Sequence, residues 1–410
     1  MGTSVTVIVG AGQAGSELAT SLRQHGYADS VVLIGDEDYV PYRRPPLSKT
    51  YLSGEVTLES LFLKPRAVYE KHAIECRFGI GVESIDRAAR SLRLYDGSVL
   101  RYDKLALTTG GRPRRLSVPG AERSNVHYIR TVADIDRLKQ QFGEGKRLVI
   151  IGGGYIGLET ASVGIKKGLH VTVVEALPRV LARVTAPEIS AFYERVHRGH
   201  GVDLRTGVGV HALEGNGDAC TVVLADGTRL AADLVVIGVG LIPNTELAEA
   251  AGIEVSNGIV VDRYAVTSDP DIVAAGDCTN HDNVFLGRRL RLESVPNALE
   301  QARVAAASIL GRPRVYDAVP WFWSDQYDLK LQMVGLSQGH DDLIVRGDMD
   351  ANSFTAFYLK DGVVISADSV NRPQDFMVAK RLVAERAAVP SERLRDDAVT
   401  LKSLLQATAA

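Results

Sequence analysis

Three glycines near the start of the sequence have the spacing of a phosphate-binding turn. Gly10, Gly12 and Gly15 follow the β-branched apolar run 5–9 and precede a helix-forming segment at 16–25. In this order, the turn lets the backbone approach a pyrophosphate. The helix N-terminus then directs free N–H groups and a partial positive charge at the phosphates. The pattern predicts a dinucleotide-binding site.

A carboxylate follows this turn at the distance that a ribose contact requires. A second apolar strand is predicted at 30–34, and Asp36 comes about 20 residues after the last glycine of the turn. Glycines with this spacing also occur in ordinary loops. The strand and the carboxylate together favour a dinucleotide over an ordinary loop.

The same pattern occurs a second time in the chain. A strand is predicted at 148–151, followed by Gly152, Gly154 and Gly157 and by a helix that runs towards Lys167 and is ended by Gly168. One such fold could be a fortuitous match. Two in one chain indicate two dinucleotides, and hence FAD together with a nicotinamide cofactor.

The second copy also leads to a carboxylate. Glu175 follows the predicted strand 170–174, about 20 residues after the last glycine, where it can bond both ribose hydroxyls of NAD. Its charge would repel a 2′-phosphate, so the sequence favours NADH over NADPH. Arg179 and Arg183 follow shortly afterwards and temper this preference.

The composition argues against several other classes of function. The formal net charge of −3 indicates neither nucleic acid nor an anionic membrane surface as a partner. No apolar run approaches the roughly 20 residues that a bilayer span needs, and the first strand leaves no room for a signal peptide. Cys76, Cys220 and Cys278 form no C-x-x-C pair. We therefore expect a cytoplasmic protein with reduced thiols, no thiol–disulfide redox centre and no metal site.

Positive charge is predicted beside the first phosphate site. The proline-rich loop 41–49 carries Arg43, Arg44 and Lys49 and enters a helix near Ser48. On local sequence alone, a solvated loop and a flavin contact are equally good interpretations.

Two further strand ends could reach a cofactor. The strand predicted at 105–111 ends in small residues that let the backbone approach a ligand, and the strand at 271–277 leads to Asp277. The Asp277 carboxylate could accept a ribityl or ribose hydroxyl, although an aspartate after glycine is more often a turn residue. A helix predicted at 293–307 offers a further dipole for an electron-rich ring.

The C-terminal part, 319–410, has a different pattern of predicted strands and helices. It begins with both tryptophans of the chain, Trp321 and Trp323. Strand-like stretches and then helices follow, which indicates an antiparallel sheet with helices on one side, a separate domain. The predicted strands are 329–334, 342–346, 354–359 and 363–369.

At this point the motifs resemble a known family over nearly the whole chain. They are similar to those of the FAD-dependent ferredoxin reductases that serve bacterial haem monooxygenases and ring dioxygenases, of the putidaredoxin reductase and palustrisredoxin reductase type. The matching stretches are V-G-A-G-Q-A-G, R-P-P-L-S-K, T-T-G-G-R-P-R, I-G-G-G-Y-I-G-L-E, G-L-I-P-N, A-A-G-D-C, E-S-V-P-N-A-L-E-Q-A and W-F-W-S-D-Q.

The resemblance implies an α/β fold like that of glutathione reductase, with two Rossmann-type dinucleotide-binding domains and a C-terminal α/β domain. The expected FAD-binding domain is discontinuous, at 1–112 and 246–318. The NAD-binding domain is expected at 113–245 and the C-terminal domain at 319–410.

The resemblance also implies which residues bind each cofactor. Lys49 and Glu159 would lie close to the flavin and nicotinamide rings and position them, and Trp323 would lie on the side that faces ferredoxin. Gly35 precedes Asp36 where many flavoproteins have Glu, so the ribose contact of Asp36 is expected to be less direct. The implied FAD contacts are Gly10, Gly12, Ala14, Gly15, Asp36, Arg44, Lys49, Val82, Arg130, Asp277 and Val295. The implied NADH contacts are Gly152, Gly154, Tyr155, Ile156, Glu159, Glu175 and Gly240.

The implied activity is transfer of a hydride from NADH to FAD, and then of single electrons to a [2Fe-2S] ferredoxin that feeds an oxygenase. The ferredoxin would dock transiently by charge, with Arg288, Arg289 and Arg291 as candidate basic contacts. The enzyme itself would be a monomer or weak dimer.

Two other classes of function stay open. One is an NADH oxidase or a nitrite-reductase-type flavoenzyme, whose electrons go to oxygen or to an internal partner. The other is a non-catalytic NADH-sensing flavoprotein that resembles apoptosis-inducing factors, which would turn over slowly and form a long-lived charge-transfer complex with NAD.

Overall fold

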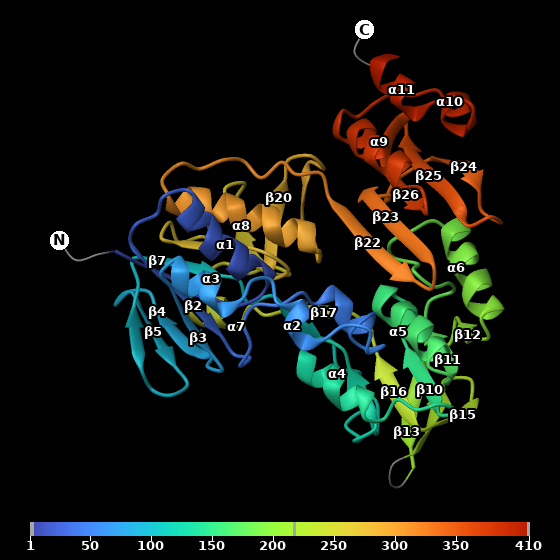
Figure 1. The fold of residues 1–410 in the computed structure, drawn as a ribbon, viewed down its shortest axis with the longest axis horizontal. Helices are drawn as coiled ribbons and strands as arrows, with labels where there is room; N and C mark the ends of the chain where they lie inside the picture. Colours follow the sequence, from blue (N-terminus) through green and yellow to red (C-terminus); the bar gives the residue numbers. More distant parts are fainter. Residues whose placement is uncertain (1–3, 216–218, 408–410) are drawn as a thin grey trace. The chain divides into compact units, whose positions relative to one another are not determined.

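The structure, a computed structural model, describes residues 4–215 and 219–407 and divides the chain into two compact units (Figure 1). Each unit is assembled from separate stretches of the chain. The first unit consists of Met1–Arg43, Glu59–Arg112 and Ile242–Pro320, and the second of Arg44–Leu58, Pro113–Leu241 and Trp321–Ala410.

The first unit is built around a five-stranded parallel sheet in the order β19-β7-β1-β2-β3. The first glycine turn connects its central strand to helix α1, as predicted. The strands are β1 (Val5–Val9), β2 (Ser30–Gly35), β3 (Ile74–Phe78), β7 (Lys104–Leu107) and β19 (Ile272–Ala274). The helices of this unit are α1 (Gln13–Gln24), α3 (Arg66–Lys71), α7 (Glu246–Ala250) and α8 (Val295–Ile309), with the short α2 (Leu58–Leu61) at its border.

Both faces of this sheet are buried. Successive side chains of each strand point to opposite faces, so neighbouring residues of one strand belong to different apolar clusters. Ile8 packs with Leu18 of α1 in one apolar cluster. Its neighbours Val7 and Val9 belong to a second cluster together with Leu92 of the small sheet β4-β5-β6. Continuous apolar strands such as β1 therefore suit a sheet that is covered on both sides.

Smaller sheets complete the first unit. A turn at Asp96-Gly97 lies between β5 and β6, with Gly97 in the left-handed region at φ +83°. The strands are β4 (Val82–Asp86), β5 (Ser91–Leu94), β6 (Val99–Arg101), β18 (Ile259–Val261), β20 (Thr279–Asn283) and β21 (Arg288–Leu290). The short strands β8 (Gly111–Pro113) and β17 (Leu241–Pro243), which pair with each other, lie where the chain passes from one unit to the other.

The second unit contains another parallel sheet of five strands, in the order β12-β11-β10-β16-β9. Helix α5 ends before Gly168, as predicted, because that residue adopts φ +75°. The strands are β9 (Val126–Tyr128), β10 (Arg147–Ile151), β11 (His170–Glu175), β12 (Asp203–Thr206) and β16 (Leu234–Ile237), with β13 (Val210–Glu214), β14 (Cys220–Leu224) and β15 (Arg229–Ala232) in an antiparallel sheet. The helical segments are η1 (Pro45–Ser48), α4 (Val132–Lys139), α5 (Tyr155–Lys166) and α6 (Pro187–Gly199).

The same unit includes the predicted antiparallel C-terminal sheet, in the order β22-β23-β26-β25-β24. Helix α9 packs on three of its strands. The strands are β22 (Trp321–Gln326), β23 (Leu329–Gly335), β24 (Asp342–Asp348), β25 (Ser353–Lys360) and β26 (Val363–Val370). The helices are α9 (Pro373–Ala384), α10 (Ser391–Arg395) and α11 (Leu401–Ala407).

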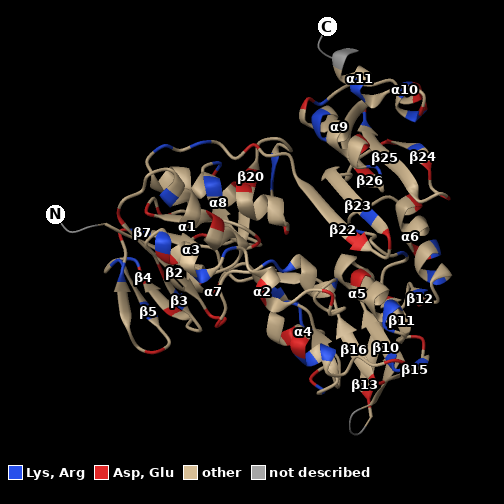
Figure 2. Ribbon diagram, viewed as in Figure 1, with Lys and Arg blue, Asp and Glu red and all other residues tan. Residues whose placement is uncertain are grey.

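Two parallel sheets with glycine turns, together with an antiparallel sheet that carries helices, agree with the predicted fold class. The division into domains at 112/113, 245/246 and 318/319 stays a prediction. Basic and acidic side chains are interspersed over both units (Figure 2). Within residues 4–215 and 219–407, the structure has no helix both long and apolar enough to cross a bilayer.

One buried charge holds the C-terminal segment. Arg346 on β24 is only 3% exposed, and its guanidinium lies against the carboxylates of Asp375 and Asp397. It also donates hydrogen bonds to four backbone carbonyls after α9, those of Leu394, Asp396, Asp397 and Val399.

We therefore expect Arg346→Met to destabilise the protein strongly. Removing one partner of a buried charge network typically costs about 3–5 kcal/mol. Thermal unfolding should show a lowered midpoint, and proteolysis should open the segment 394–399. Arg381→Met is the matched control, because Arg381 is an exposed helix residue paired with Glu385 and should have little effect. Equal stability of the two variants would contradict this account of Arg346.

Candidate functional site

The first glycine turn has the backbone that a pyrophosphate site needs. Gly10 adopts φ +108°, and its N–H donates to the carbonyl of Ile34 at 2.9 Å. A Cβ at position 10 would overlap the carbonyl oxygen of Thr108, at the end of β7. The glycine is therefore required both by the left-handed conformation and by the close approach of two strands.

The second turn repeats these features in the other unit. Gly152 adopts φ +112°, and its N–H donates to the carbonyl of Val174 at 2.8 Å. A Cβ at position 152 would overlap the carbonyl oxygen of Gly238. The two turns are thus the same local structure built twice, as the sequence predicts.

The middle glycine of each turn faces open space. Gly12 and Gly154 are the N-cap residues of α1 and α5, neither helix has a side-chain cap, and a Cβ at either position would meet no protein atom within 4 Å. By contrast, a Cβ at Gly15 or Gly157 would overlap the backbone of its own turn. Each helix therefore presents uncapped N–H groups beside an open position, which fits a pyrophosphate.

Glu175 ends β11 and is held beside the second turn. One carboxylate oxygen accepts the N–H of Gly153 at 2.7 Å, and the other accepts that of Leu177 at 2.8 Å. Arg179 is turned inward, because its guanidinium donates to the carbonyl of Thr185 at 2.9 Å. Arg183 is exposed. Arg179, the arginine that follows Glu175 more closely in sequence, is thus engaged within its own loop.

The first turn has no equivalent carboxylate at that position. Val9 pairs with Ile34 as Ile151 pairs with Val174, so Gly35 takes the place of Glu175. A Cβ at Gly35 would overlap the side chain of Ala11. Asp36 follows as an exposed residue, and its contact with a ribose stays a prediction.

Several other predicted FAD contacts lie near the carboxyl end of the first sheet. Ala14 is buried in α1, and a Cβ at Gly276, next to Asp277, would come within 3.2 Å of its methyl group. Val295 is the first residue of α8, whose N-cap hydroxyl accepts an intrahelical N–H. Val82 is buried at the start of β4. The assignment of these residues to FAD stays a prediction.

The remaining predicted FAD contacts belong to the second unit. Arg44 donates to the backbone carbonyl of Arg130 at 2.6 Å, so these two are brought together. Lys49 follows η1 and contacts Glu159 of α5.

Lys49 and Glu159 form an ion pair, with Nζ and Oε1 2.8 Å apart. The Glu159 side chain is only 3% exposed, and Lys49 is 15% exposed. The hydroxyls of Ser48 and Ser324 donate to the two carboxylate oxygens, each at 2.6 Å. A buried carboxylate needs such compensation, because removal from water penalises its charge.

These two serines were not among the predicted site residues, although both lie in motifs that carry the family resemblance. Ser48 precedes Lys49 in R-P-P-L-S-K, and Ser324 follows Trp323 in W-F-W-S-D-Q. The only sequence feature that pointed to them was a serine directly beside a predicted site residue.

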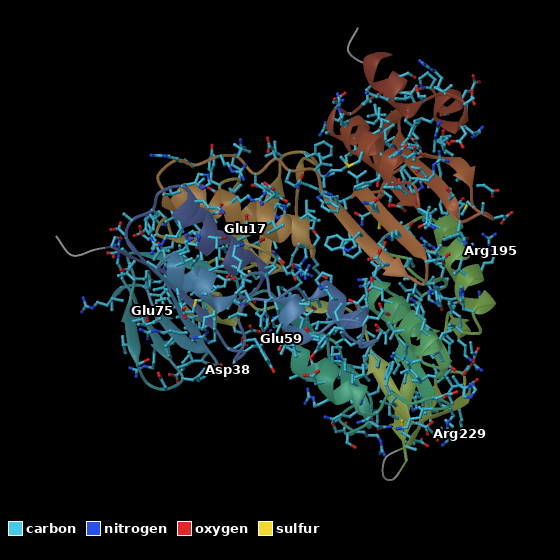
Figure 3. The ribbon with its side chains drawn as sticks, viewed as in Figure 1. Glu17, Asp38, Glu59, Glu75, Arg195 and Arg229 are labelled. Atoms are coloured by element: carbon cyan, nitrogen blue, oxygen red, sulfur yellow. The ribbon has the colours of Figure 1, made fainter. Side chains whose placement is uncertain are left out.

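The first repeat uses the corresponding carboxylate differently. Glu17 lies two residues after Gly15, as Glu159 lies two residues after Gly157. Glu17, labelled in Figure 3, pairs with Arg303 of α8 at 2.7 Å. The same position thus supports helix packing in one repeat and carries a buried charge in the other.

The other predicted NADH contacts surround the second turn. Tyr155 and Ile156 open α5, where Tyr155 packs against Phe322 with ring centroids 4.9 Å apart and Ile156 is exposed. Gly240 follows β16, which runs parallel to β10, so it leaves the sheet at the same edge as the glycine turn.

The two tryptophans lie on one face of β22, with ring centroids 5.6 Å apart. Trp321 packs against Phe376 of α9 and under the ammonium group of Lys380, as expected for an anchoring aromatic. Trp323 is half-buried.

The predicted basic cluster is more structural than expected. Arg289 donates to the carbonyl of Val261 at 2.8 Å and pairs with Asp282. Arg291 is 13% exposed and pairs with Glu293. Much of this charge is neutralised within the unit, which weakens the cluster as a candidate docking surface.

Comparison with known families identifies two matches. Residues 4–302 match the family described as pyridine nucleotide-disulphide oxidoreductase, and residues 321–405 match the reductase C-terminal family. The chain is 47% identical to putidaredoxin reductase CamA of Pseudomonas putida, over 98% of this chain and 97% of that protein.

Solved structures agree with these matches. The covalent putidaredoxin reductase–putidaredoxin complex contains a chain with a TM-score of 0.96 and 46% identity, with 100% of both chains covered. The ferredoxin reductase for the CYP199A2 system from Rhodopseudomonas palustris has a TM-score of 0.95 and 44% identity, with 98% and 99% covered. The predicted fold class and family resemblance are confirmed.

The open middle glycines make a sharp test of the two turns. Both adopt backbone angles that alanine tolerates, so Gly12→Ala and Gly154→Ala should leave the fold intact and place a methyl group where a phosphate would bind. We expect Gly12→Ala to lose flavin during purification and Gly154→Ala to keep it but bind NADH more weakly, by about tenfold or more.

Flavin content and NADH titration measure the two effects, and circular dichroism checks the fold. The same loss in both variants, or no loss in either, would contradict the assignment of one turn to each dinucleotide.

Proposed function

The chain belongs to the pyridine nucleotide-disulphide oxidoreductase family, and we propose that it is an NADH-dependent ferredoxin reductase that carries FAD. Its acceptor would be a [2Fe-2S] ferredoxin that feeds an oxygenase. The observation that carries this proposal is the pair of matching glycine turns, in a chain similar throughout its length to reductases of oxygenase systems.

The residues present fit two dinucleotides. Each turn leaves an open position at Gly12 or Gly154 beside uncapped helix N–H groups, so each can accept a pyrophosphate without rearrangement. Bound FAD would supply the chemistry that converts a two-electron hydride donor into single electrons for an iron–sulfur acceptor. The protein would supply binding, orientation and electrostatics.

Four residues would have positioning roles. Glu175 would bind the ribose of the nicotinamide cofactor with its carboxylate oxygens. The Lys49–Glu159 pair would orient the nicotinamide ring, because it is a rigid, buried and hydrogen-bonded group near the start of α5. Trp323 would offer an apolar surface to the ferredoxin. We further propose a cytoplasmic location, where its three free cysteines would remain reduced.

The function is tested by ferredoxin-dependent reduction of cytochrome c. With NADH, an acidic [2Fe-2S] ferredoxin should accelerate cytochrome c reduction many-fold over the enzyme alone. Fast oxygen consumption without ferredoxin would instead indicate an oxidase, and slow turnover with a persistent charge-transfer band would indicate a sensor.

Trp323→Ala refines this test. It should leave reduction of the flavin by NADH unchanged in stopped-flow traces but slow reduction of the ferredoxin. Trp321→Ala is the comparison variant, because Trp321 packs against α9 and should mainly lower stability. Equal loss in both half-reactions for Trp323→Ala would contradict the proposed contact.

Glu175 should set the preference for NADH. A 2′-phosphate beside this carboxylate would be repelled by at least about 1 kcal/mol, which is roughly fivefold in affinity. The kcat/KM for NADH should exceed that for NADPH, and Glu175→Ala should reduce the ratio. Arg183→Ala, which removes the exposed cation eight residues further along the chain, should lower activity only with NADPH. A wild-type preference for NADPH would contradict the role of Glu175.

A further inference from the structure

The buried Glu159 carboxylate stands at the end of a row of hydrogen bonds. Ser324 donates to its Oε1 at 2.6 Å, and the Gln326 side-chain amide lies 3.2 Å from the Ser324 hydroxyl. The Gln326 carbonyl oxygen is 2.8 Å from Nε2 of His197, and Nδ1 of His197 is 3.0 Å from the hydroxyl of Tyr327. The row therefore runs from the β22–β23 turn to α5.

The members of this row are shielded from water. Ser324, Gln326 and His197 are each at most 1% exposed. The ring of His200 stacks on Tyr327, with centroids 3.8 Å apart and planes at 10°. Solvent therefore has little access to exchange or reorient these hydrogen bonds.

The ion pair dictates the direction of every bond in the row. An ionised carboxylate only accepts, so Ser324 must give its single hydroxyl proton to Glu159. Its oxygen can then only accept, so the Gln326 amide must present N–H to Ser324 and its carbonyl to His197. His197 must therefore carry its proton on Nε2.

The far end of the row is consistent with this order. Burial lowers the pKa of His197 to about 4, so the imidazole is neutral at pH 7 and its Nδ1 can accept. Burial raises the pKa of Tyr327, so its hydroxyl keeps its proton and can donate. Each hydrogen thus points along the row towards Glu159.

Tyr327 is held in an unusual conformation at this end. It is the first of the two residues that connect β22 to β23, and it adopts φ +54°, where glycine is the usual residue. Its N–H donates to the hydroxyl of Ser162 on α5 at 2.8 Å. A bulky side chain is kept in a strained turn, which indicates that its position matters.

We propose that Gln326 and His197 are positioning residues for Glu159, acting through Ser324. This inference rests on the proposed function, because it assigns Glu159 to the nicotinamide site. Because Gln326 presents N–H to Ser324, it offers the Ser324 hydroxyl no competing acceptor. The hydroxyl therefore stays on the carboxylate, which in turn holds the ammonium group of Lys49. Reversing the direction of these hydrogen bonds should therefore slow the hydride step without removing any residue that contacts a cofactor.

Gln326→Glu reverses the direction of the hydrogen bond between positions 326 and 324. Above its pKa, a carboxylate at 326 cannot donate to Ser324, so the Ser324 hydroxyl turns towards position 326 and is lost to Glu159. We expect reduction of the flavin by NADH to slow by about tenfold, the effect of one lost hydrogen bond to a charged group. Gln374→Glu, an exposed site at the start of α9, is the matched control and should have no effect.

A double-mutant cycle with Ser324→Ala separates the effect of the lost Ser324–Glu159 hydrogen bond from the effect of the added negative charge. If the harm passes through Ser324, Gln326→Glu should add little once the hydroxyl has been removed. If the full tenfold loss persists in the Ser324→Ala background, the effect is direct repulsion and the proposal is wrong.

A second readout needs no cofactor turnover. In protein labelled with ¹⁵N-histidine, the His197 signals, assigned with a His197→Gln variant, should show the proton on Nε2. Ser324→Ala removes the acceptor of the Gln326 N–H, so the amide can flip and present its N–H to Nε2 of His197. The Nδ1–H form of His197 should therefore become populated in that variant. A proton on Nδ1 in the wild type would overturn the proposal.

The outcomes distinguish this inference from the proposed function. If NADH does not reduce the wild-type flavin, the proposed function fails whatever the tautomer. If NADH reduces wild type and Gln326→Glu at equal rates, the function stands and the positioning role of the row is refuted. Flavin content and the thermal midpoint show whether each variant is folded.

Discussion

The buried charge of Glu159 is the constraint on which the second unit depends. A carboxylate with 3% exposure on α5 requires a cation and donors within hydrogen-bond distance. These come from segments far apart in the chain, Lys49 and Ser48 from the end of η1 and Ser324 from β22. The ion pair and its two serine donors thus connect the three segments of the second unit, 44–58, 113–241 and 321–410.

The two repeats share one backbone conformation but differ in the side chains around it. The turns at Gly10 and Gly152 share the same conformation and the same close approach to a neighbouring strand. What differs is the charge around them, because Glu175 accepts two backbone N–H groups beside the second turn, whereas Gly35 occupies the equivalent position in the first. The phosphate cradle is thus shared, and the ribose contacts distinguish the two sites.

Much of this architecture could be predicted from local sequence. Glycines with positive φ, apolar strands and the helix end at Gly168 are determined by neighbours in the chain, and so they appear in the pattern. The partners of Glu159 could not be predicted, because a hydroxyl donor 165 residues away leaves no periodic signal. The same holds for Arg289, whose acceptors belong to other strands, so that part of the charge of the basic cluster is paired within the unit. Side-chain pairs between distant segments depend on the tertiary fold and leave no pattern in the local sequence.

The central claim is that the chain converts a two-electron donor into a source of single electrons for a ferredoxin. An anaerobic titration followed by flavin absorbance tests it most directly. One equivalent of NADH should bleach the flavin of the holoenzyme, and about two equivalents of oxidised [2Fe-2S] ferredoxin should restore it while becoming reduced. If the bleached flavin is restored only by oxygen and the ferredoxin stays oxidised, the claim is contradicted.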